Sequence, residues 1–514
     1  MSAAEPGTDR DPVSLLQSLE PLSPDLTDRY LEHHGVLPLG LEEGHLLVGT
    51  WLDEVDPQAL DDLRAIAGSP IELVRLPEAD LRNAIQRVYQ PEAVTAEDLI
   101  AGLDAEVRTE VGESDAALDD LVAMANEAPV VKLVNLLLLE ALEARASDVH
   151  LETYQGGVRV RYRVDGVLQE APAPPKRLAA AVVSRLKIMA ELDIAERRVP
   201  QDGRIRLRMK DRQVDVRVAT LPTLHGESVV LRLLDKDQGT IGLAALGMAD
   251  DTRAAFERVI SKPHGIVLAT GPTGSGKTTT LYSAIDHIRT GREKIVTVED
   301  PVEYELAGVP QVPVNEKVGL TFASALRALL RQDPDVMLVG EIRDHDTAEI
   351  ATHAALTGHL VLSTLHTNDA ATALTRLVDL GIEPFLVAST VEAVLAQRLV
   401  RTICGECRTP TELTVEERSA LGLDPAVPVP AWVGAGCEAC RNTGYRGRIG
   451  IYELLVMDDE LRTAMHEDPS AGRITRIAST KGMRLLHEDG VRLIREGVTT
   501  GEEVLRVASG GGGG

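Results

Sequence analysis

Apolar and polar positions alternate with short periods through the first 90 residues of the 514-residue chain. The apolar run Leu46–Val48 predicts a strand, and two helical repeats follow it. The apolar positions of these repeats are Leu60, Leu63 and Ile66, then Leu81, Ile85 and Val88. Residues 1–90 are therefore expected to form a small α/β module, and we find no candidate catalytic residue in them.

The next region, residues 91–128, lacks strong apolar periodicity and is rich in acidic side chains. Glu110, Glu113, Asp115, Asp119 and Asp120 are examples. Like charges repel and extend a chain, and a segment without an apolar face does not pack into a core. We interpret this region as an acidic linker, helical or flexible, that tethers the first module loosely.

Strand-like alternation dominates residues 129–236, after an apolar helix expected over residues 131–146. The apolar positions Val158, Val160, Tyr162 and Val164 alternate with arginines, and Asp165-Gly166 supplies a turn. Further strands are expected over residues 204–209, 213–219 and 228–234. These residues therefore predict a second domain of the α+β class.

Residues 237–509 contain a buried strand, a glycine-rich turn and a helix in direct succession. The strand is expected over residues 265–270 and the helix over residues 279–285. Such a turn cradles phosphate with backbone N–H groups at a helix N-terminus. An ordinary glycine-rich turn is disfavoured, because strand, loop and helix occur together in the required order. The phosphate loop consists of Gly271, Pro272, Thr273, Gly274, Ser275, Gly276, Lys277 and Thr278.

This loop predicts binding of a nucleoside triphosphate with Mg²⁺, where Lys277 reaches the β- and γ-phosphates and the Thr278 hydroxyl ligates the metal. Three more strand-like runs end in polar residues, over residues 294–298, 336–339 and 360–364. Ligands of open parallel sheets lie at the carboxyl ends of the strands. Glu303 and Glu341, which follow the first two runs, are the candidates to position water and to support the Mg²⁺ shell.

Two histidines and four arginines are further candidates. His359 and His366 are seven residues apart, so on one strand they face opposite sides and at most one need contact nucleotide. Structural hydrogen bonding is the alternative for both. Arg327 and Arg331 are four apart and share a helix face. Arg217 and Arg232 lie on strands of the second domain, where pattern alone favours a solvated strand face.

Composition narrows the function further. The formal net charge is -27 and the pI is near 4.9, which disfavours nucleic acid as the main partner. No apolar run reaches the roughly 18 residues of a membrane span, and the first residues lack the pattern of a signal peptide. We expect a cytoplasmic protein that contacts membranes only through partner proteins.

The four cysteines form two CxxC pairs with 29 residues between them. Two such pairs can enclose one tetrahedral Zn²⁺ without leaving an open coordination position. The gap is longer than the commonest zinc spacing, and redox-active thiols are the alternative. We predict a structural zinc site formed by Cys404, Cys407, Cys437 and Cys440.

These motifs together resemble the Walker A, Asp, Walker B and His boxes of the secretion ATPases, the superfamily that powers type II secretion and type IV pili. The matching segments are residues 271–278, 297–303, 333–344 and 357–369. Residues 200–204 and 225–227 resemble the family's second domain, and residues 437–448 its zinc subdomain. The resemblance covers residues 129–509 and favours the type II secretion branch. The pilus-retraction branch lacks the tetracysteine element.

The resemblance implies a hexameric RecA-like P-loop ATPase whose PAS-like α+β domain, residues 129–236, closes over nucleotide. The ATPase domain, residues 237–509, would include a zinc subdomain at residues 400–448, and the Gly tail 510–514 is expected to be disordered. By this resemblance, Glu303 would be the catalytic glutamate and Glu341 would support the coordination of Mg²⁺. Gly340-Glu341 replaces the usual acidic pair, so Mg²⁺ coordination depends more on water. The four implied phosphate-contacting arginines are Arg217, Arg232, Arg327 and Arg331.

The family also implies partners and a location. The N-terminal module would dock on the cytoplasmic domain of an inner-membrane secretion-platform protein, and the hexamer would act on an inner-membrane platform protein. Hydrolysis would then drive pseudopilus assembly and export of folded proteins. A type IV pilus-extension ATPase is the alternative within the family. Outside it, a nucleic-acid motor is disfavoured by the acidic charge, and an ATP-binding scaffold without turnover is disfavoured by Glu303 and Glu341.

Overall fold

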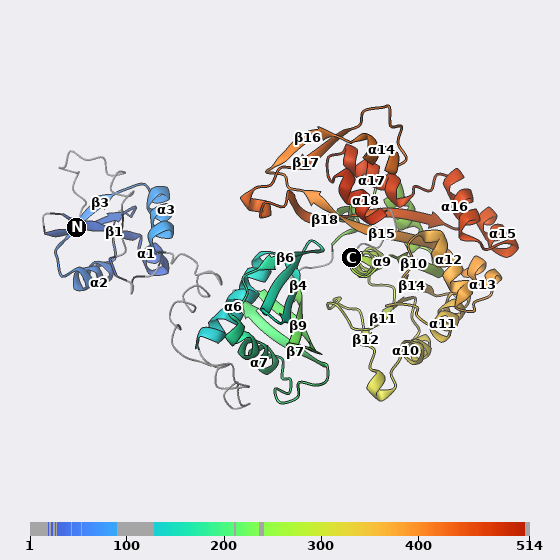
Figure 1. Ribbon diagram of the computed structural model, residues 1–514, viewed down its shortest axis with the longest axis horizontal. Helices are drawn as coiled ribbons and strands as arrows, with labels where there is room; N and C mark the ends of the chain where they lie inside the picture. The colour runs from blue at the N-terminus through green and yellow to red at the C-terminus, as the bar shows by residue number, and fades with distance from the viewer. Residues whose placement is uncertain are drawn as a thin grey trace. The chain divides into compact units, whose positions relative to one another are not determined.

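The computed structural model forms two compact units, Met1–Gly112 and Glu113–Gly514 (Figure 1). The described residues are 28–89, 128–209, 212–235 and 241–508 without Glu43 and Asp53, together with Leu19, Leu22, Ser23 and Leu26. The predicted acidic linker, except Ala128, and the Gly tail lie outside them. Among the described residues, no helix is long and apolar enough to cross a membrane.

The first unit is the predicted small α/β module. Its sheet has the order β1-β2-β3, in which β1 and β2 are antiparallel and β2 and β3 are parallel. The expected strand at Leu46–Val48 and both expected helices are confirmed as β2, α2 and α3. The elements are α1 (Asp28–His34), β1 (Val36–Glu42), β2 (His45–Thr50), α2 (Pro57–Ala67), β3 (Ile71–Arg75) and α3 (Glu78–Tyr89).

A six-stranded antiparallel sheet with the order β6-β5-β4-β9-β8-β7 begins the second unit. Helices α6 (Ala128–Glu143) and α7 (Ala179–Met189) accompany it (Figure 1). The four predicted strands are confirmed, with longer bounds, as β5 (Gly157–Val164), β7 (Gln201–Met209), β8 (Arg212–Thr223) and β9 (Gly226–Asp235). The sheet also contains β4 (Ala146–Tyr154) and β6 (Val167–Ala171), which were not predicted.

The predicted helix over residues 131–146 is wrong at both ends. Helix α6 begins three residues earlier, at Ala128, and ends at Glu143. Arg145 adopts a positive φ of 56°, which an α-helix cannot continue, and Ala146 is the first residue of β4. The sequence interpretation overlooked β4, the strand that pairs with both β5 and β9 at the centre of this sheet.

A seven-stranded sheet with the order β12-β11-β13-β14-β10-β15-β18 carries the rest of the second unit. All neighbouring strands are parallel except β15 and β18. The predicted strands are confirmed as β10, β11, β13 and β14, and every residue of these four is buried. The strands are β10 (Gly265–Thr270), β11 (Ile295–Glu299), β12 (Gln311–Pro313), β13 (Val336–Val339), β14 (Leu360–Leu365), β15 (Val391–Ile403) and β18 (Tyr445–Val456).

Helices cover both faces of this sheet, so successive residues of β10 belong to two cores. Ile266 and Leu268 face one cluster, and Val267 and Ala269 face the other. Such two-sided burial explains the continuous apolar runs in the sequence. The helices are α8 (Asp250–Ile260), α9 (Lys277–Ile288), α10 (Phe322–Leu329), α11 (His345–Leu356), α12 (Ala370–Asp379), α13 (Pro384–Thr390), α15 (Asp459–Glu467), α16 (Ala471–Thr480), α17 (Leu486–Arg495) and α18 (Gly501–Ala508).

A small excursion interrupts this domain between β15 and β18. It consists of the antiparallel hairpin β16 (Arg408–Glu412) and β17 (Pro430–Gly434), with α14 (Val415–Ala420) between the two strands. Both CxxC pairs lie where this excursion leaves and rejoins the main sheet. The domain boundary expected near residue 236 stays a prediction, because residues 236–240 lie outside the described part of the chain.

Candidate functional site

The predicted phosphate loop connects β10 to α9. Three of its glycines have positive φ, 151° at Gly271, 78° at Gly274 and 87° at Gly276, which other residues rarely adopt. The Ser275 Oγ is buried and has no hydrogen-bond partner among the described residues. A tight loop with an unpaired buried hydroxyl at a helix N-terminus suits a phosphate ligand.

Lys277, the first residue of α9, turns back over this loop. Its Nζ donates hydrogen bonds to the backbone oxygens of Gly271, at 2.7 Å, and Pro272, at 3.0 Å. Burial lowers the pKa of Lys277 to about 8, a net value to which the charge of Glu341 contributes by raising it and that of Arg398 by lowering it. The ammonium is therefore a buried cation whose partners are only carbonyl dipoles, and a phosphate group is a stronger partner.

Glu341 and His366 follow β13 and β14, where β14 is the neighbour of the loop strand β10 and β13 is the next strand beyond it. Arg343 forms an ion pair of 2.5 Å with Glu341 Oε1, and His366 Nε2 lies 3.3 Å from Glu341 Oε2. The Glu341 side chain is 13% exposed, so it can still meet a ligand. The structure thus brings Glu341 and His366 together. Glu341 is also close enough to Lys277 for its negative charge to raise the pKa of the lysine.

Glu303 follows β11, the next strand along the same edge. Arg217 of the six-stranded domain lies 3.4 Å from Glu303 Oε2 and donates a 3.0 Å hydrogen bond to the backbone oxygen of Val302. The Glu303 side chain is 34% exposed, which leaves the carboxylate open to water. Arg217 is therefore not on the solvated strand face that pattern alone favoured, because the domain contact gives it a carboxylate partner.

The structure does not bring the remaining candidates to the loop. His359 precedes β14, and the pairing of Gly265 with Leu360 puts it at the amino end of the sheet, opposite the loop. Its Nδ1 contacts the backbone oxygen of Ala354, in agreement with the alternative interpretation that His359 makes structural hydrogen bonds. Arg232 pairs with Asp148 at 3.0 Å. Arg327 and Arg331 are exposed at the end of α10 and in the 3₁₀ turn after it.

Two residues that the sequence did not suggest support the loop from β15. Thr270, the last residue of β10, pairs with Ala396 of β15. Because the two strands are parallel, Gln397 and Arg398 lie beside the first residues of the loop. Gln397 Nε2 donates a 2.6 Å hydrogen bond to the Ser275 backbone oxygen, and a Cβ at Gly271 would lie 3.1 Å from the Arg398 guanidinium. They follow the loop by more than 100 residues, so no local pattern connects them to it.

A second unpredicted group holds the segment that carries Glu303. Glu299 is buried, and it accepts hydrogen bonds from Tyr282 of α9, from Thr297 at 2.6 Å and from Gln311 at 3.1 Å. Gln311 also donates to the backbone oxygen of Tyr304, at 3.2 Å. This network links the loop helix to the backbone on either side of Glu303.

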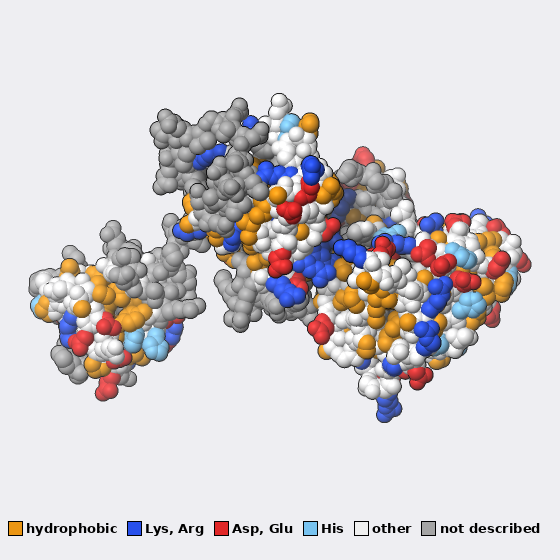
Figure 2. Space-filling model, turned by 90° about the horizontal axis from the view of Figure 1, so that it is seen from below, with side chains coloured by type: hydrophobic (Ala, Val, Ile, Leu, Met, Phe, Trp, Pro, Cys, Tyr) orange, Lys and Arg blue, Asp and Glu red, His pale blue; other side chains and the backbone are white. Residues whose placement is uncertain are grey.

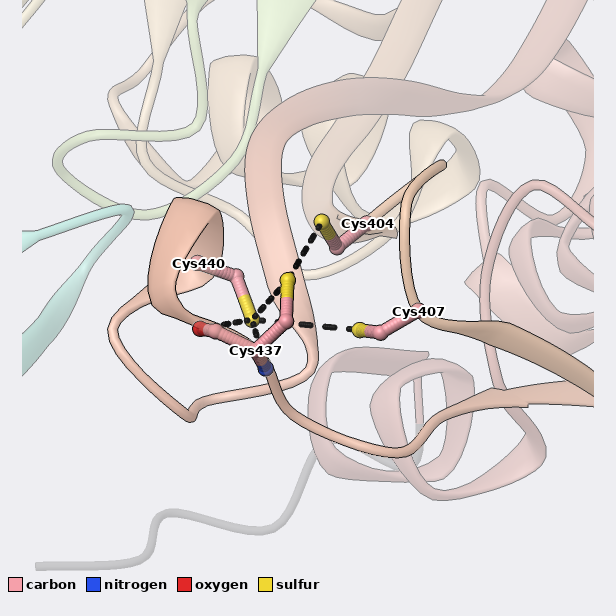
Figure 3. A group of neighbouring side chains, drawn as sticks. All are labelled: Cys404, Cys407, Cys437 and Cys440. Carbon is pink, nitrogen blue, oxygen red and sulfur yellow. Dashed lines mark hydrogen bonds between the residues drawn. The ribbon is translucent and has the colours of Figure 1, made fainter. Parts of the chain in front are cut away.

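The four cysteines meet as predicted, at the base of the β16–β17 excursion, and Figure 3 shows their side chains pointing toward one another from two chain segments. The Sγ atoms are 3.8 Å apart for Cys404 and Cys437, 3.9 Å for Cys407 and Cys440, and 3.7 Å for Cys437 and Cys440. Four Zn–S bonds of about 2.3 Å in a tetrahedron give S···S edges of about 3.8 Å. The spacing therefore fits one zinc ion.

The hydrogen bonds of this cluster favour a thiolate at Cys440, whereas burial raises the pKa of Cys407. Against a backbone hydrogen bond that lowers it, burial and hydrogen bonds to the other cysteines raise the pKa of Cys437 to about 11. The backbone N–H groups of Cys437 and Gly444 donate to Cys440 Sγ at 3.2 and 3.3 Å. Burial opposes ionisation of Cys440, but these donors outweigh it and lower the pKa of the thiol to about 6. With four thiolates, the site would leave no position for substrate, so its role would be structural.

We expect Cys437→Ser to release the metal and unfold residues 404–447 locally, because tetracysteine sites of this kind supply folding free energy. Elemental analysis should find about one Zn²⁺ per chain in the unmodified protein and none in the variant. ATP hydrolysis should persist, since the cluster does not contact the phosphate loop. Thr411→Ser, on the same excursion, is the control. Metal-free unmodified protein with four freely reactive thiols would contradict the zinc site.

Family models identify the chain. The model described as "Type II/IV secretion system protein" matches residues 123–506. The chain belongs to this family. A second model, the MshEN domain, matches residues 6–95, which include nearly all of the N-terminal module. The secretion ATPase predicted from the motifs is therefore confirmed, as is its multidomain α/β fold.

Individual relatives support the same conclusion. Type II secretion system protein E of Pseudomonas aeruginosa is 50% identical over 483 residues, which are 93% of this chain and 95% of that protein. The type IV pilus assembly ATPase PilB of Myxococcus xanthus is 46% identical over 484 residues, 92% of this chain and 84% of that protein. The crystal structure of the pilus retraction motor PilT with bound ADP has a TM-score of 0.50 and 27% identity, covering 72% of this chain and 95% of PilT.

Proposed function

We propose that this secretion ATPase hydrolyses ATP to drive pseudopilus assembly and the export of folded proteins by a type II secretion system. The convergence of four neighbouring strands on one phosphate loop supports this most strongly. The loop, Glu341, His366 and Glu303 follow β10, β13, β14 and β11, which are neighbours in the sheet. A triphosphate held by the loop would therefore meet a histidine and two carboxylates.

Each residue has a distinct role in this proposal. Lys277 exchanges its carbonyl partners for the β- and γ-phosphates, and the Thr278 hydroxyl would hold the Mg²⁺ that accompanies ATP. When bound, the ion would supply neutralisation of phosphate charge. Glu341, held by Arg343 and His366, would orient water around that ion. Glu303 accepts the proton of the attacking water, and Arg217 keeps the carboxylate at the site.

The exposed arginines are best explained by a homohexamer. Arg327 and Arg331 do not contact the phosphate loop of their own subunit in any described interaction. The Arg327 side chain lies 3.9 Å from Asp346, and the Arg331 guanidinium donates a 3.0 Å hydrogen bond to the Arg327 backbone oxygen. Phosphoryl transfer commonly uses arginines supplied by a second protein surface. We propose that they reach the site of a neighbouring subunit.

Activity per subunit should then rise steeply with protein concentration. Lys277→Ala and Arg331→Ala should each be inactive alone, and their mixture should regain activity because a Lys277→Ala subunit can supply Arg331 to a neighbour with an intact loop. Steady-state ATPase assays across concentrations and mixing ratios measure both effects. Arg476→Ala, at an exposed arginine of α16, is the control. A dilute monomer with full activity would contradict the hexamer.

The N-terminal module is proposed to dock on the cytoplasmic domain of an inner-membrane secretion-platform protein. Its own core, with Leu31, Leu63 and Ile85 fully buried, supports a separately folded docking unit. Through this partner the hexamer would act as a peripheral protein at the inner membrane. It would transmit motion to an inner-membrane platform protein, and the tetracysteine excursion is the proposed contact for it.

Loss of secretion is the decisive test. Deleting the gene should leave normally exported enzymes in the cell, and expression of the unmodified chain, but not of Lys277→Ala, should restore export. The alternative function is assembly of a type IV pilus, favoured by the 46% identity to PilB. A deletion strain that exports normally and lacks surface pili would support that alternative and overturn the secretion role.

A further inference from the structure

Three arginines stand in register across neighbouring strands of the six-stranded sheet. Arg204 of β7 pairs with Arg217 of β8, and Arg217 pairs with Arg232 of β9. Directly paired residues of antiparallel strands point to the same face of a sheet. The three guanidinium groups therefore form one row, which we call the arginine row, and two of its members are already candidates from the sequence.

The arginine row lines a groove of about 390 Å³. Val218, Ala219 and Val230 also line it, and Asp202 is the one acidic residue among its lining residues. In Figure 2, Lys and Arg side chains gather near the middle of the view, whereas acidic and basic side chains are mixed over much of the rest. A row of cations in a chain of net charge -27 is unusual for a surface without a ligand.

The three arginines differ in their partners. Arg217 pairs with Glu303 at 3.4 Å, and Arg232 pairs with Asp148 at 3.0 Å. The Arg204 side chain is exposed and makes no hydrogen bond or ion pair with any residue that the structure describes. Burial is the main cause that lowers the pKa of Arg217, and the charges of Arg204 and Arg232 lower it further, against Glu303.

Like charges directly opposite one another across strands destabilise a sheet. The neighbouring row on the same face shows the ordinary arrangement, because there Arg206 pairs with Asp215. An anion that binds all three arginines would offset the repulsion within the arginine row. Arg217 contacts Glu303, which is proposed to activate the water that attacks ATP. The terminal phosphate of ATP is therefore the anion that the proposed reaction would bring to the arginine row.

We infer that Arg204 is a third cation of a clamp on the terminal phosphate of ATP, alongside Arg217 and Arg232. The inference rests on the proposed function and adds a residue to its site. Arg204 and Arg232 flank Arg217 on its two neighbouring strands, so one phosphate group above Arg217 can accept hydrogen bonds from both. The clamp acts on the terminal phosphoryl group, which is transferred to water while ADP leaves, so it distinguishes ATP from ADP.

Arg204→Ala tests this clamp, and Arg206→Ala is the matched control on the same strand and face. We expect Arg204→Ala to lower kcat/KM for ATP by roughly 10²-fold, the order found when one fixed donor to a transition state is lost. Its affinity for ADP should stay unchanged. Arg206→Ala should match the unmodified protein in both measurements, and Arg204→Lys should recover part of the activity through its charge. Both positions are exposed, so both variants should stay folded. The thermal midpoint of Arg204→Ala should not fall below that of the unmodified protein, because the substitution removes a like charge opposite Arg217.

Equal kcat/KM for Arg204→Ala and Arg206→Ala would overturn the clamp. Equal weakening of ATP and ADP binding by Arg204→Ala would also overturn it, because the arginine would then not act on the terminal phosphate. An unmodified protein that binds but does not hydrolyse ATP would overturn the proposed function instead. In that case the ATP and ADP affinities of the two variants still decide the role of Arg204.

Discussion

Glu303→Gln should still bind ATP but hydrolyse it roughly 10²–10⁴-fold more slowly, the range that general-base catalysis supplies. Glutamine has nearly the shape of glutamate, but its amide does not accept a proton from water. The side chain is partly exposed beside Arg217, so the substitution leaves no buried unpaired charge. Fluorescent-nucleotide binding and phosphate-release assays measure the two effects separately.

Glu305→Gln is the matched control, because Glu305 lies two residues away in the same segment and is exposed. It should hydrolyse ATP at the unmodified rate. Near-normal turnover by Glu303→Gln would show that another group accepts the proton, and Glu341, held by Arg343 and His366, would be tested next. Loss of ATP binding by Glu303→Gln would indicate a structural role for the carboxylate.

The sequence predicted four neighbouring strands of the seven-stranded sheet, but not β12, β15 and β18, because the pattern of those four is local. Both faces of β10, β11, β13 and β14 are covered, so each strand is a continuous apolar run that is easy to recognise. The parallel arrangement of these strands then requires their carboxyl ends to meet. For this reason Glu303 and Glu341 could be placed, from the sequence, on the edge that carries the phosphate loop.

Strand direction argues against His359 in the same way. A residue that precedes a parallel strand lies at its amino end, and the pairing of Gly265 with Leu360 puts His359 at the edge opposite the loop. From the sequence we compared the two histidines by the face of the strand and overlooked its direction. His366, at the carboxyl end of β14, reaches Glu341.

Tertiary contacts account for what sequence patterns did not predict. Arg217 has the alternating pattern of a solvated strand, yet a glutamate 86 residues further along the chain is its partner. Gln397 supports Ser275 through the parallel pairing of β10 and β15, whose sequence separation is longer than a local pattern extends. Arg145 follows the end of α6 with a positive φ, and the sequence there contains no glycine or proline from which the end of the helix could be predicted.

Lys277→Ala should abolish tight nucleotide binding, because the β- and γ-phosphates lose their buried cation.

The unmodified protein should also bind ADP more weakly as the pH rises above about 8. In the nucleotide-free loop, burial lowers the pKa of Lys277 to about 8, whereas a bound phosphate favours the ammonium and raises that pKa. Below pH 8 both states carry the proton, and affinity does not depend on this group.

Above pH 8 the free loop loses the proton and the complex keeps it, so the affinity should fall about tenfold per pH unit until the pKa of the complex is reached. Phosphate groups themselves titrate near pH 6 and do not interfere. Calorimetric titration with ADP at pH 7, 8 and 9 measures the effect. Lys317→Ala, a lysine outside the loop, should keep the same profile. A flat profile for the unmodified protein would mean that Lys277 stays charged in the empty loop, with a stronger partner than the Gly271 and Pro272 carbonyls.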